Sequence, residues 1–321
     1  MSAHGGSKAI IAALLANTGI AVTKFIAAFL SGSASMLAEG VHSVADAGNQ
    51  VLLLVGKKRS QQAADAEHPF GYGRTRYVYA FIVAIVLFSV GGLYSLYEGI
   101  HKVQDPHPLD PTWWWLPLVV LVVAIGLESF SLRTAVRESN LVRGKQGWVA
   151  FIRRAKAPEL PVVLLEDVAA LIGLVFALLG VGLTAITGNG LFDGLGTLAI
   201  AGLLIAVAVV LGIEMKSLLV GEGANPDDDA TIRAAIESHP RIVRLIHSKT
   251  LYVGPEELLV AAKIGFDADL PLSSVASAID EIEATIRERV PVARIIYLEA
   301  DVYQAAKAAP PTDAIVIKSA D

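Results

Sequence analysis

The chain has 321 residues, of which 54% are hydrophobic and only 18% charged, and its net charge at pH 7 is −5. Its mean hydropathy of +0.57 lies far above that of an ordinary soluble domain, so the composition excludes a purely soluble protein and predicts a polytopic membrane protein. The chain contains no cysteine, which excludes disulfides and thiolate metal sites and leaves histidine and carboxylates as the ligands of any transition metal.

Six apolar stretches follow one another along the first two thirds of the chain, and each is near the about 20 residues that a bilayer requires. They lie at residues 8–30, 34–56, 77–100, 113–136, 160–187 and 192–215. The sequence therefore predicts an α-helical membrane protein with six transmembrane helices in a domain spanning residues 1–222.

A separate, acidic domain is predicted for residues 223–304. Residues 1–222 carry a net charge of +1 and residues 223–321 carry −6. Apolar side chains alternate along residues 257–266 and recur at helical spacing along residues 273–289, so the expected order is α-β-β-α-β. That order predicts two helices on one face of a three-stranded sheet. The Ala- and Pro-rich end, residues 305–321, is predicted to be disordered.

Basic residues in the short loops predict the orientation of the helices. The loops between the second and third and between the fourth and fifth stretches hold five basic residues each: Lys57, Lys58, Arg59, Arg74 and Arg76, and Arg143, Lys145, Arg153, Arg154 and Lys156. The opposite loops hold only Lys102, so we expect both termini in the cytoplasm. Met1–Ser7 is too short for a transit peptide, and we therefore expect a bacterial inner membrane.

A polar stripe interrupts the second apolar stretch. Spacings of three or four residues place Glu39, His42, Asp46 and Asn49 on one helical face, and Gln50 follows. Ionisable side chains inside a membrane are costly, so they indicate a functional site. Imidazole and carboxylate together suit zinc and similar divalent metals. The alternative is that these side chains hydrogen-bond neighbouring helices or line a water-filled cavity.

Other ionisable residues receive weaker predictions. Glu39 is expected to support the metal ligand His42 from one turn away, to be a proton relay, or to bond the first helix at Asn17 or Thr18. Glu128 is placed near a helix end, where no function is assigned. We expect structural or surface roles for His239 and His247.

Two motifs resemble the cation diffusion facilitators, the family that includes the solute-carrier zinc transporters. One is Ser35-Met36-Leu37-Ala38-Glu39-Gly40-Val41-His42-Ser43-Val44-Ala45-Asp46, and the other is Glu67-His68-Pro69-Phe70-Gly71-Tyr72-Gly73-Arg74. The resemblance continues through residues 165–173 and Asp193 into the tail domain. It implies a homodimer of six-helix subunits with a metallochaperone-like (ferredoxin-like) cytoplasmic domain, which exchanges a divalent cation for protons.

The resemblance also implies the transport site. Carried onto this sequence, its ligands are His42 and Asp46 in the second helix and Asp167 in the fifth, where the family's other histidine position holds Val163. Helical geometry places Glu166 about 60° to one side of Val163, so we expect it either to reach the missing fourth ligand position or to face a neighbouring helix. The Glu166-Asp167 form is similar to the mitochondrial zinc transporter branch, which lacks this histidine too.

The predicted function is therefore proton-coupled export of a divalent cation, zinc first, with the ion as substrate and no cofactor. Two alternatives stay open: a metal-binding sensor that does not transport, and an exporter of iron, manganese or cobalt. We expect no enzyme, since no nucleophile–base arrangement or phosphate-binding glycine loop appears. An acidic soluble domain also argues against nucleic acid as a partner.

Overall fold

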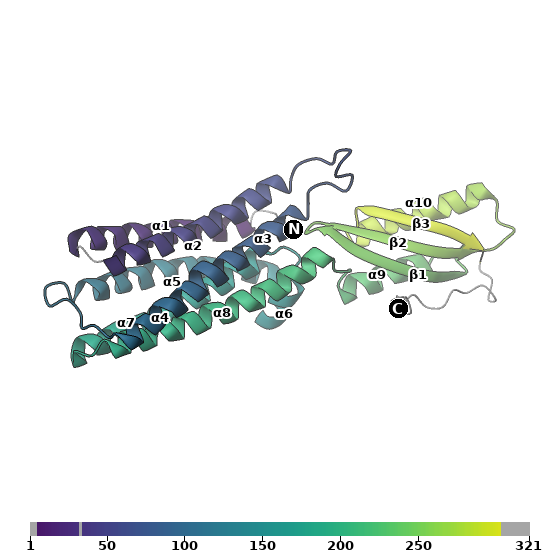
Figure 1. Ribbon diagram of the computed structural model, residues 1–321. Helices are drawn as coiled ribbons and strands as arrows, with labels where there is room; N and C mark the ends of the chain where they lie inside the picture. The colour runs from purple at the N-terminus through teal and green to yellow at the C-terminus, as the bar shows by residue number, and fades with distance from the viewer. Residues whose placement is uncertain (1–4, 32–33, 303–321) are drawn as a thin grey trace, which may run out of the picture. The chain divides into compact units, whose positions relative to one another are not determined.

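The computed structural model describes residues 5–31 and 34–302, and the predicted disordered segment 305–321 lies outside them. The chain divides into two compact units, Met1–Leu219 and Val220–Asp321. The first unit is helical, as Figure 1 shows. Its elements are α1 (Gly5–Ser31), α2 (Ala34–Arg59), α3 (Thr75–Val86), η1 (Leu87–Leu93), α4 (Tyr94–Gln104), α5 (Leu116–Arg143), α6 (Trp148–Arg154), α7 (Glu159–Thr187) and α8 (Leu191–Val220).

Five of the predicted spans are helices long and apolar enough to cross a membrane. They are α1, α5, α7, α8 and the continuous helix Thr75–Gln104, which comprises α3, η1 and α4. The segment predicted as the second span is also a helix, the 26-residue α2, but its polar stripe and basic end leave it less apolar than the other five. The first unit is thus that of a multi-pass membrane protein.

Several helices extend beyond the apolar stretches that predicted them. The fourth stretch, residues 113–136, is observed as α5 at Leu116–Arg143, and the helix continues through a polar segment that contains Arg137 and Glu138. The short helix α6 was not predicted, because its seven residues are too few to show a hydrophobic period. The π-helical turn η1 was not predicted either.

Small residues bring the helices of the first unit close together. A Cβ atom on Gly180 of α7 would lie 2.8 Å from the carbonyl oxygen of Phe192, and one on Gly92 of η1 would lie 2.6 Å from Cγ1 of Ile205 in α8. Such close approach is typical of helix packing in membranes, where the apolar solvent offers no hydrophobic driving force between helices. The α1 helix packs against α2 and α5, and α5 packs against α7.

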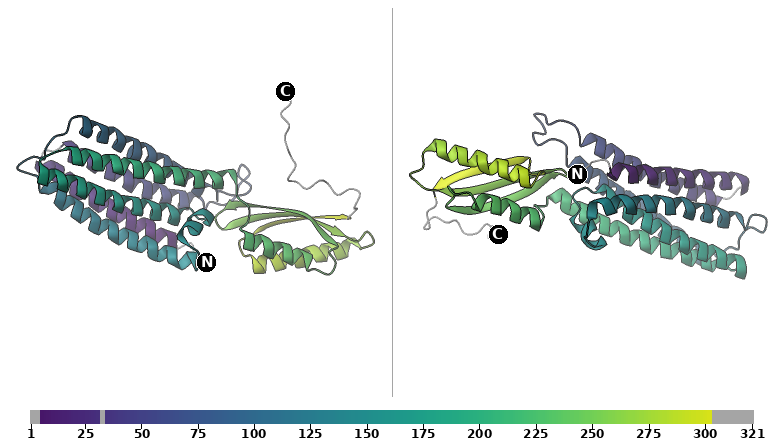
Figure 2. Two further views of the ribbon diagram at one scale, coloured as in Figure 1. Left: turned by 90° about the horizontal axis from the view of Figure 1, so that it is seen from below. Right: turned by 180° about the vertical axis from the view of Figure 1, so that it is seen from behind.

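The second unit has the predicted α-β-β-α-β order: α9 (Pro226–Glu237), β1 (Arg244–Gly254), β2 (Glu257–Phe266), α10 (Leu272–Arg289) and β3 (Ile295–Val302). The β1 and β2 strands pair antiparallel, and β2 and β3 pair parallel across α10. Both helices cover the same face of the sheet (Figure 2). Alternate residues of β2, including Leu258, Val260 and Ile264, are fully buried against Ile236 and Ile282, which confirms the predicted alternation.

Candidate intramembrane metal site

The α2 stripe faces the interior of the helical unit. The Nε2 atom of His42 lies 3.8 Å from Oδ2 of Asp46, one turn further along the helix. These two side chains are 21% and 28% exposed, whereas Asn49 and Gln50 are buried. Among the described residues no group donates to or accepts from Nδ1 of His42. The helix therefore presents an imidazole and a carboxylate that are ready to bind a ligand.

Asp167 enters the same region from α7. Its side chain is buried, and Oδ2 accepts a 2.7 Å hydrogen bond from the Ser131 hydroxyl of α5. Within the described part of the chain its other oxygen, Oδ1, has no partner. One hydroxyl thus orients the carboxylate and leaves one oxygen available.

Glu166 lies at the contact of α7 with α2. Its Oε1 atom accepts a hydrogen bond of 3.2 Å from the Asn49 amide, and Oε2 accepts one of 2.7 Å from the Gln50 amide. The two amides of the polar stripe therefore hold both oxygens of this carboxylate. Val163, at the position of the family's histidine, is fully buried in an apolar cluster with Leu53 and Ala135.

A cavity of ≈ 720 Å³ joins these elements. His42, Asp46 and Glu166 line its inner part, and it extends to the α4–α5 loop at Pro108 and to Gly190 at the start of α8. Among the described residues, however, no three histidine or carboxylate side chains come close enough together to hold one ion. In this conformation His42, Asp46 and Glu166 share the cavity, Asp167 is not among its lining residues, and the predicted ligands do not converge.

Glu128 also lines this cavity, and the prediction that it sits near a helix end is wrong. It lies near the middle of α5 and is 1% exposed. The sequence could have indicated a functional role, because Glu128 follows an uninterrupted run of apolar residues, and an ionisable group within an apolar membrane segment indicates function.

The partner predicted for Glu39 is also corrected. Its carboxylate lies 3.0 Å from the ammonium of Lys24 on α1, whereas the Thr18 hydroxyl donates to the Leu14 carbonyl of its own helix. The π-helical turn is a further missed element, since a Cβ atom on Gly91 would lie 3.8 Å from Cε1 of His42. Such turns are frequent at functional sites.

The helices pack tightly at the end that carries the basic loops. The Arg76 guanidinium forms a two-pronged ion pair with the Glu159 carboxylate between α3 and α7, and both side chains are buried. The Lys57 ammonium donates to the Ser7 hydroxyl at 2.6 Å. Two of the basic residues assigned to a loop therefore hold neighbouring helices together.

The loop between α2 and α3 is organised by Asp65. Its carboxylate accepts hydrogen bonds from the backbone N–H groups of Glu67 and His68 and from the Tyr72 hydroxyl. The bond from Tyr72, followed by that from His68, holds the pKa of Asp65 below its ordinary value. Gly71 follows with a φ of 72°, a conformation that favours glycine. The second sequence motif thus specifies a closed loop.

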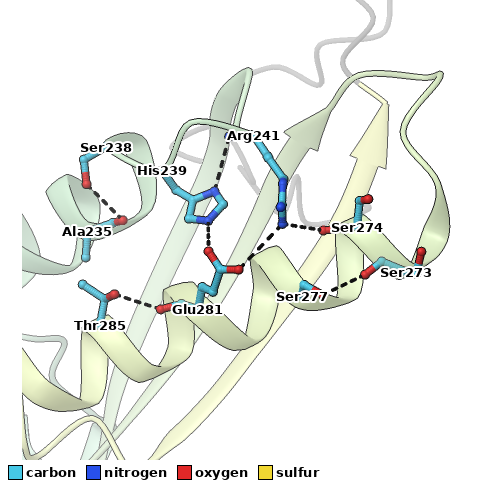
Figure 3. A network of polar contacts seen from close by, with 9 residues as sticks. All are labelled: Ala235, Ser238, His239, Arg241, Ser273, Ser274, Ser277, Glu281 and Thr285. Carbon is cyan, nitrogen blue, oxygen red and sulfur yellow. Dashed lines mark hydrogen bonds and ion pairs between the residues drawn. The ribbon is translucent and has the colours of Figure 1, made fainter.

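In the second unit, His239 and His247 lie apart. Figure 3 shows His239 between two partners: Nδ1 accepts from the Arg241 backbone N–H, and Nε2 lies 3.0 Å from a Glu281 oxygen. This bond holds the pKa of Glu281 below its ordinary value. His247 lines a hollow of ≈ 460 Å³ with Glu283 and Glu299.

Apolar membrane-spanning helices around a cavity that carries buried carboxylates and a histidine define the class, a multi-pass membrane protein with an internal polar site. Comparison with known proteins gives the family. Residues 10–220 match the cation efflux transmembrane domain, and the chain belongs to the cation efflux family.

The chain is 34% identical over 269 residues to the mitochondrial proton-coupled zinc antiporter SLC30A9 of Xenopus laevis, which covers 83% of this chain and 48% of the relative. The Homo sapiens protein of that name is 32% identical over 266 residues, 82% of this chain and 46% of the relative. The cation-efflux pump FieF of Pectobacterium carotovorum is 25% identical over 92% of this chain and 94% of its own length. The predicted resemblance to the mitochondrial branch is confirmed, although the chain spans about half the length of these antiporters.

Proposed function

We propose that the chain exports a divalent cation, most readily zinc, from the cytoplasm in exchange for protons. The observation that carries the proposal is the cavity inside the helical unit, which is lined by His42 and Asp46 of α2 and by Glu166 of α7, the residue next to Asp167. The names of the relatives support it, since they include a proton-coupled zinc antiporter and a cation-efflux pump. The carboxylate-rich site also keeps export of iron, manganese or cobalt as the second candidate.

His42, Asp46 and Asp167 bind the ion, and the predicted fourth ligand is Glu166. Each of these groups binds a metal only when it is deprotonated, so protons and metal compete for the same atoms. Binding on one side of the membrane and protonation on the other then couple the two fluxes without a separate proton site.

The two ends of the helical unit differ, and this difference supports alternating access. We infer that six helices, α2 among them, span the membrane, and the positive-inside rule supports both termini in the cytoplasm. The cavity extends to the α4–α5 loop, while the ion pair of Arg76 with Glu159 joins α3 and α7 at the other end. The described conformation is therefore the outward-facing one. The family resemblance supports a homodimer, with the second unit, the proposed cytoplasmic domain, in each subunit.

Zinc uptake into proteoliposomes under a proton gradient tests this function. We expect Asp46→Asn to abolish uptake, because the amide cannot supply a charged ligand, while Glu138→Gln leaves it unchanged. Glu138 is a matched control, since it is buried on α5 and is not among the cavity-lining residues. Zinc binding without flux under any gradient would favour the sensor, and flux of manganese, iron or cobalt in preference to zinc would favour the other substrate.

A further inference from the structure

Glu128 is a buried carboxylate that the proposed ligand set does not use. It is 1% exposed on α5, and its Oε2 atom has no hydrogen-bond partner among the described residues. Buried polar atoms are almost always hydrogen-bonded, and a carboxylate in an apolar setting is costly without a partner. Its free oxygen therefore requires an explanation.

The position of Glu128 on α5 directs it toward the proposed ion. Ser131 lies three residues further along, so the two side chains share one helical face. The Ser131 hydroxyl donates to Asp167, which shows that this face is turned to α7. Glu128 also lines the cavity that contains His42 and Asp46. One face of α5 thus carries two relevant residues. Ser131 orients the predicted ligand Asp167, and Glu128 is a further carboxylate that could bind the ion.

Glu166 is less available for the fourth position. Both of its oxygens accept hydrogen bonds from Asn49 and Gln50, which are themselves buried. If Glu166 turned toward an ion, at least one buried amide would lose its acceptor, and leaving such a group unsatisfied is unfavourable. The Oε2 atom of Glu128 gives up no hydrogen bond in the described structure when it binds an ion.

We propose that Glu128, and not Glu166, is the fourth metal ligand, together with His42, Asp46 and Asp167. The inference rests on the proposed transport function, and it assigns to α5 the ligand that Val163 does not supply. Because the described side chains do not converge on one point, the ion draws α2 toward α5 and α7 when it binds. This site contains one imidazole and three carboxylates. It is harder than a site of two imidazoles and two carboxylates, and we therefore expect it to admit Mn²⁺ and Co²⁺ as well as Zn²⁺.

Metal binding to the full-length protein in nanodiscs tests the proposal. Glu128→Gln should weaken Zn²⁺ binding by more than about 100-fold, because substitution of residues that only orient a ligand typically costs about 10–100-fold. Glu166→Gln should stay within that smaller range, and Glu138→Gln should bind as the unmodified chain does. The visible absorption of bound Co²⁺ adds a second readout. Glu128→Gln should change this spectrum, which depends on the ligands themselves, whereas the Glu166→Gln spectrum should match that of the unmodified chain.

Asp46→Asn distinguishes a failure of the Glu128 assignment from a failure of the proposed transport site. If Asp46→Asn loses binding while Glu128→Gln keeps the affinity and the Co²⁺ spectrum of the unmodified chain, Glu128 is not a ligand and the proposed function stands. A larger loss for Glu166→Gln than for Glu128→Gln would assign the fourth position to Glu166 and overturn the inference. If Asp46→Asn binds and transports zinc as the unmodified chain does, the proposed site fails, and the inference fails with it.

Discussion

His239 and Glu281 form a pair between residues 42 positions apart in the sequence. Because Nδ1 of His239 accepts from the Arg241 backbone, the proton of the neutral ring lies on Nε2 and is donated to Glu281. This hydrogen bond, with a smaller contribution from Arg241, favours the charged carboxylate and lowers its pKa. The pair connects the end of α9 to α10 across the helical face of the second unit.

The lowered pKa of Glu281 predicts an acid-sensitive contribution to stability. A carboxyl group whose pKa is lower in the folded state stabilises the fold above its ordinary pKa of 4.5, and this contribution disappears as the pH falls through the folded value. We expect Glu281→Gln to lower the protection factors of the α10 amides at pH 7 and to reduce their further loss on acidification. Hydrogen–deuterium exchange of the full-length protein measures both. Glu283→Gln is the control, as its Arg287 pair lies within one helix, and an equal effect there would contradict the role of His239.

Single residues show where sequence reasoning reached its limit. The spacing of His42, Asp46 and Asn49 correctly placed a polar face on α2, because it depends only on local helical geometry. The partner of Glu39 was wrong because it depends on the rotation of α1 against α2. One residue changes the direction of a side chain by about 100°, so Lys24 could not be chosen over Asn17 or Thr18 without the packing.

The ion pair between Arg76 and Glu159 operates at the scale of whole helices. It joins the first turns of α3 and α7, and both partners are buried. A buried pair contributes little net stability, but removal of one partner leaves an uncompensated charge at a cost of about 3–5 kcal/mol. The pair therefore joins α3 and α7 at this end of the helical unit, and the proposed alternating access would have to break it.

Glu159→Gln should open this end. The remaining guanidinium then favours hydration over burial, and the equilibrium shifts away from the outward-facing conformation. Because the natural chain has no cysteine, an introduced Ala80→Cys in α3, at a fully buried position, reports on access to a thiol reagent. We expect the Glu159→Gln variant to label faster and to transport more slowly. Arg153→Gln, which removes an exposed partner of Glu214, should label as slowly as its parent, and unchanged labelling in Glu159→Gln would show that the pair does not close the helices.

Elements with a clear hydrophobic period were predictable, and those set by tertiary contacts were not. The five apolar spans were predictable from the length of their apolar runs, while β2 and α10 repeat their apolar residues at the period of a strand and of a helix. By contrast, no local pattern encodes η1, in which a Cβ atom on Gly92 would lie 2.6 Å from Cγ1 of Ile205 in α8. The C-terminal end of α5, at Arg143, was missed because the helix continues through polar residues after the apolar stretch ends.

At the scale of the molecule, the separation of charge and cavity supports the proposed direction of transport. Basic residues flank the loops between α2 and α3 and between α5 and α7, and the positive-inside rule therefore predicts that these loops lie in the cytoplasm. The cavity extends instead to Pro108 in the α4–α5 loop. In the proposed orientation, this cavity, which His42 and Asp46 line, would allow protons to enter from outside and displace the ion, which is the order that export requires.

This arrangement predicts opposite labelling of two loops. In intact cells, a membrane-impermeant thiol reagent should label Pro108→Cys and leave Ala63→Cys, in the α2–α3 loop, unlabelled until the membrane is permeabilised. Thr197→Cys, which lines the cavity on α8, should also label from outside, because the described conformation connects it to the α4–α5 loop. The chain without an introduced cysteine provides the background signal. Labelling of Ala63→Cys in place of Pro108→Cys would invert the orientation, and the same cavity would then deliver cations to the cytoplasm.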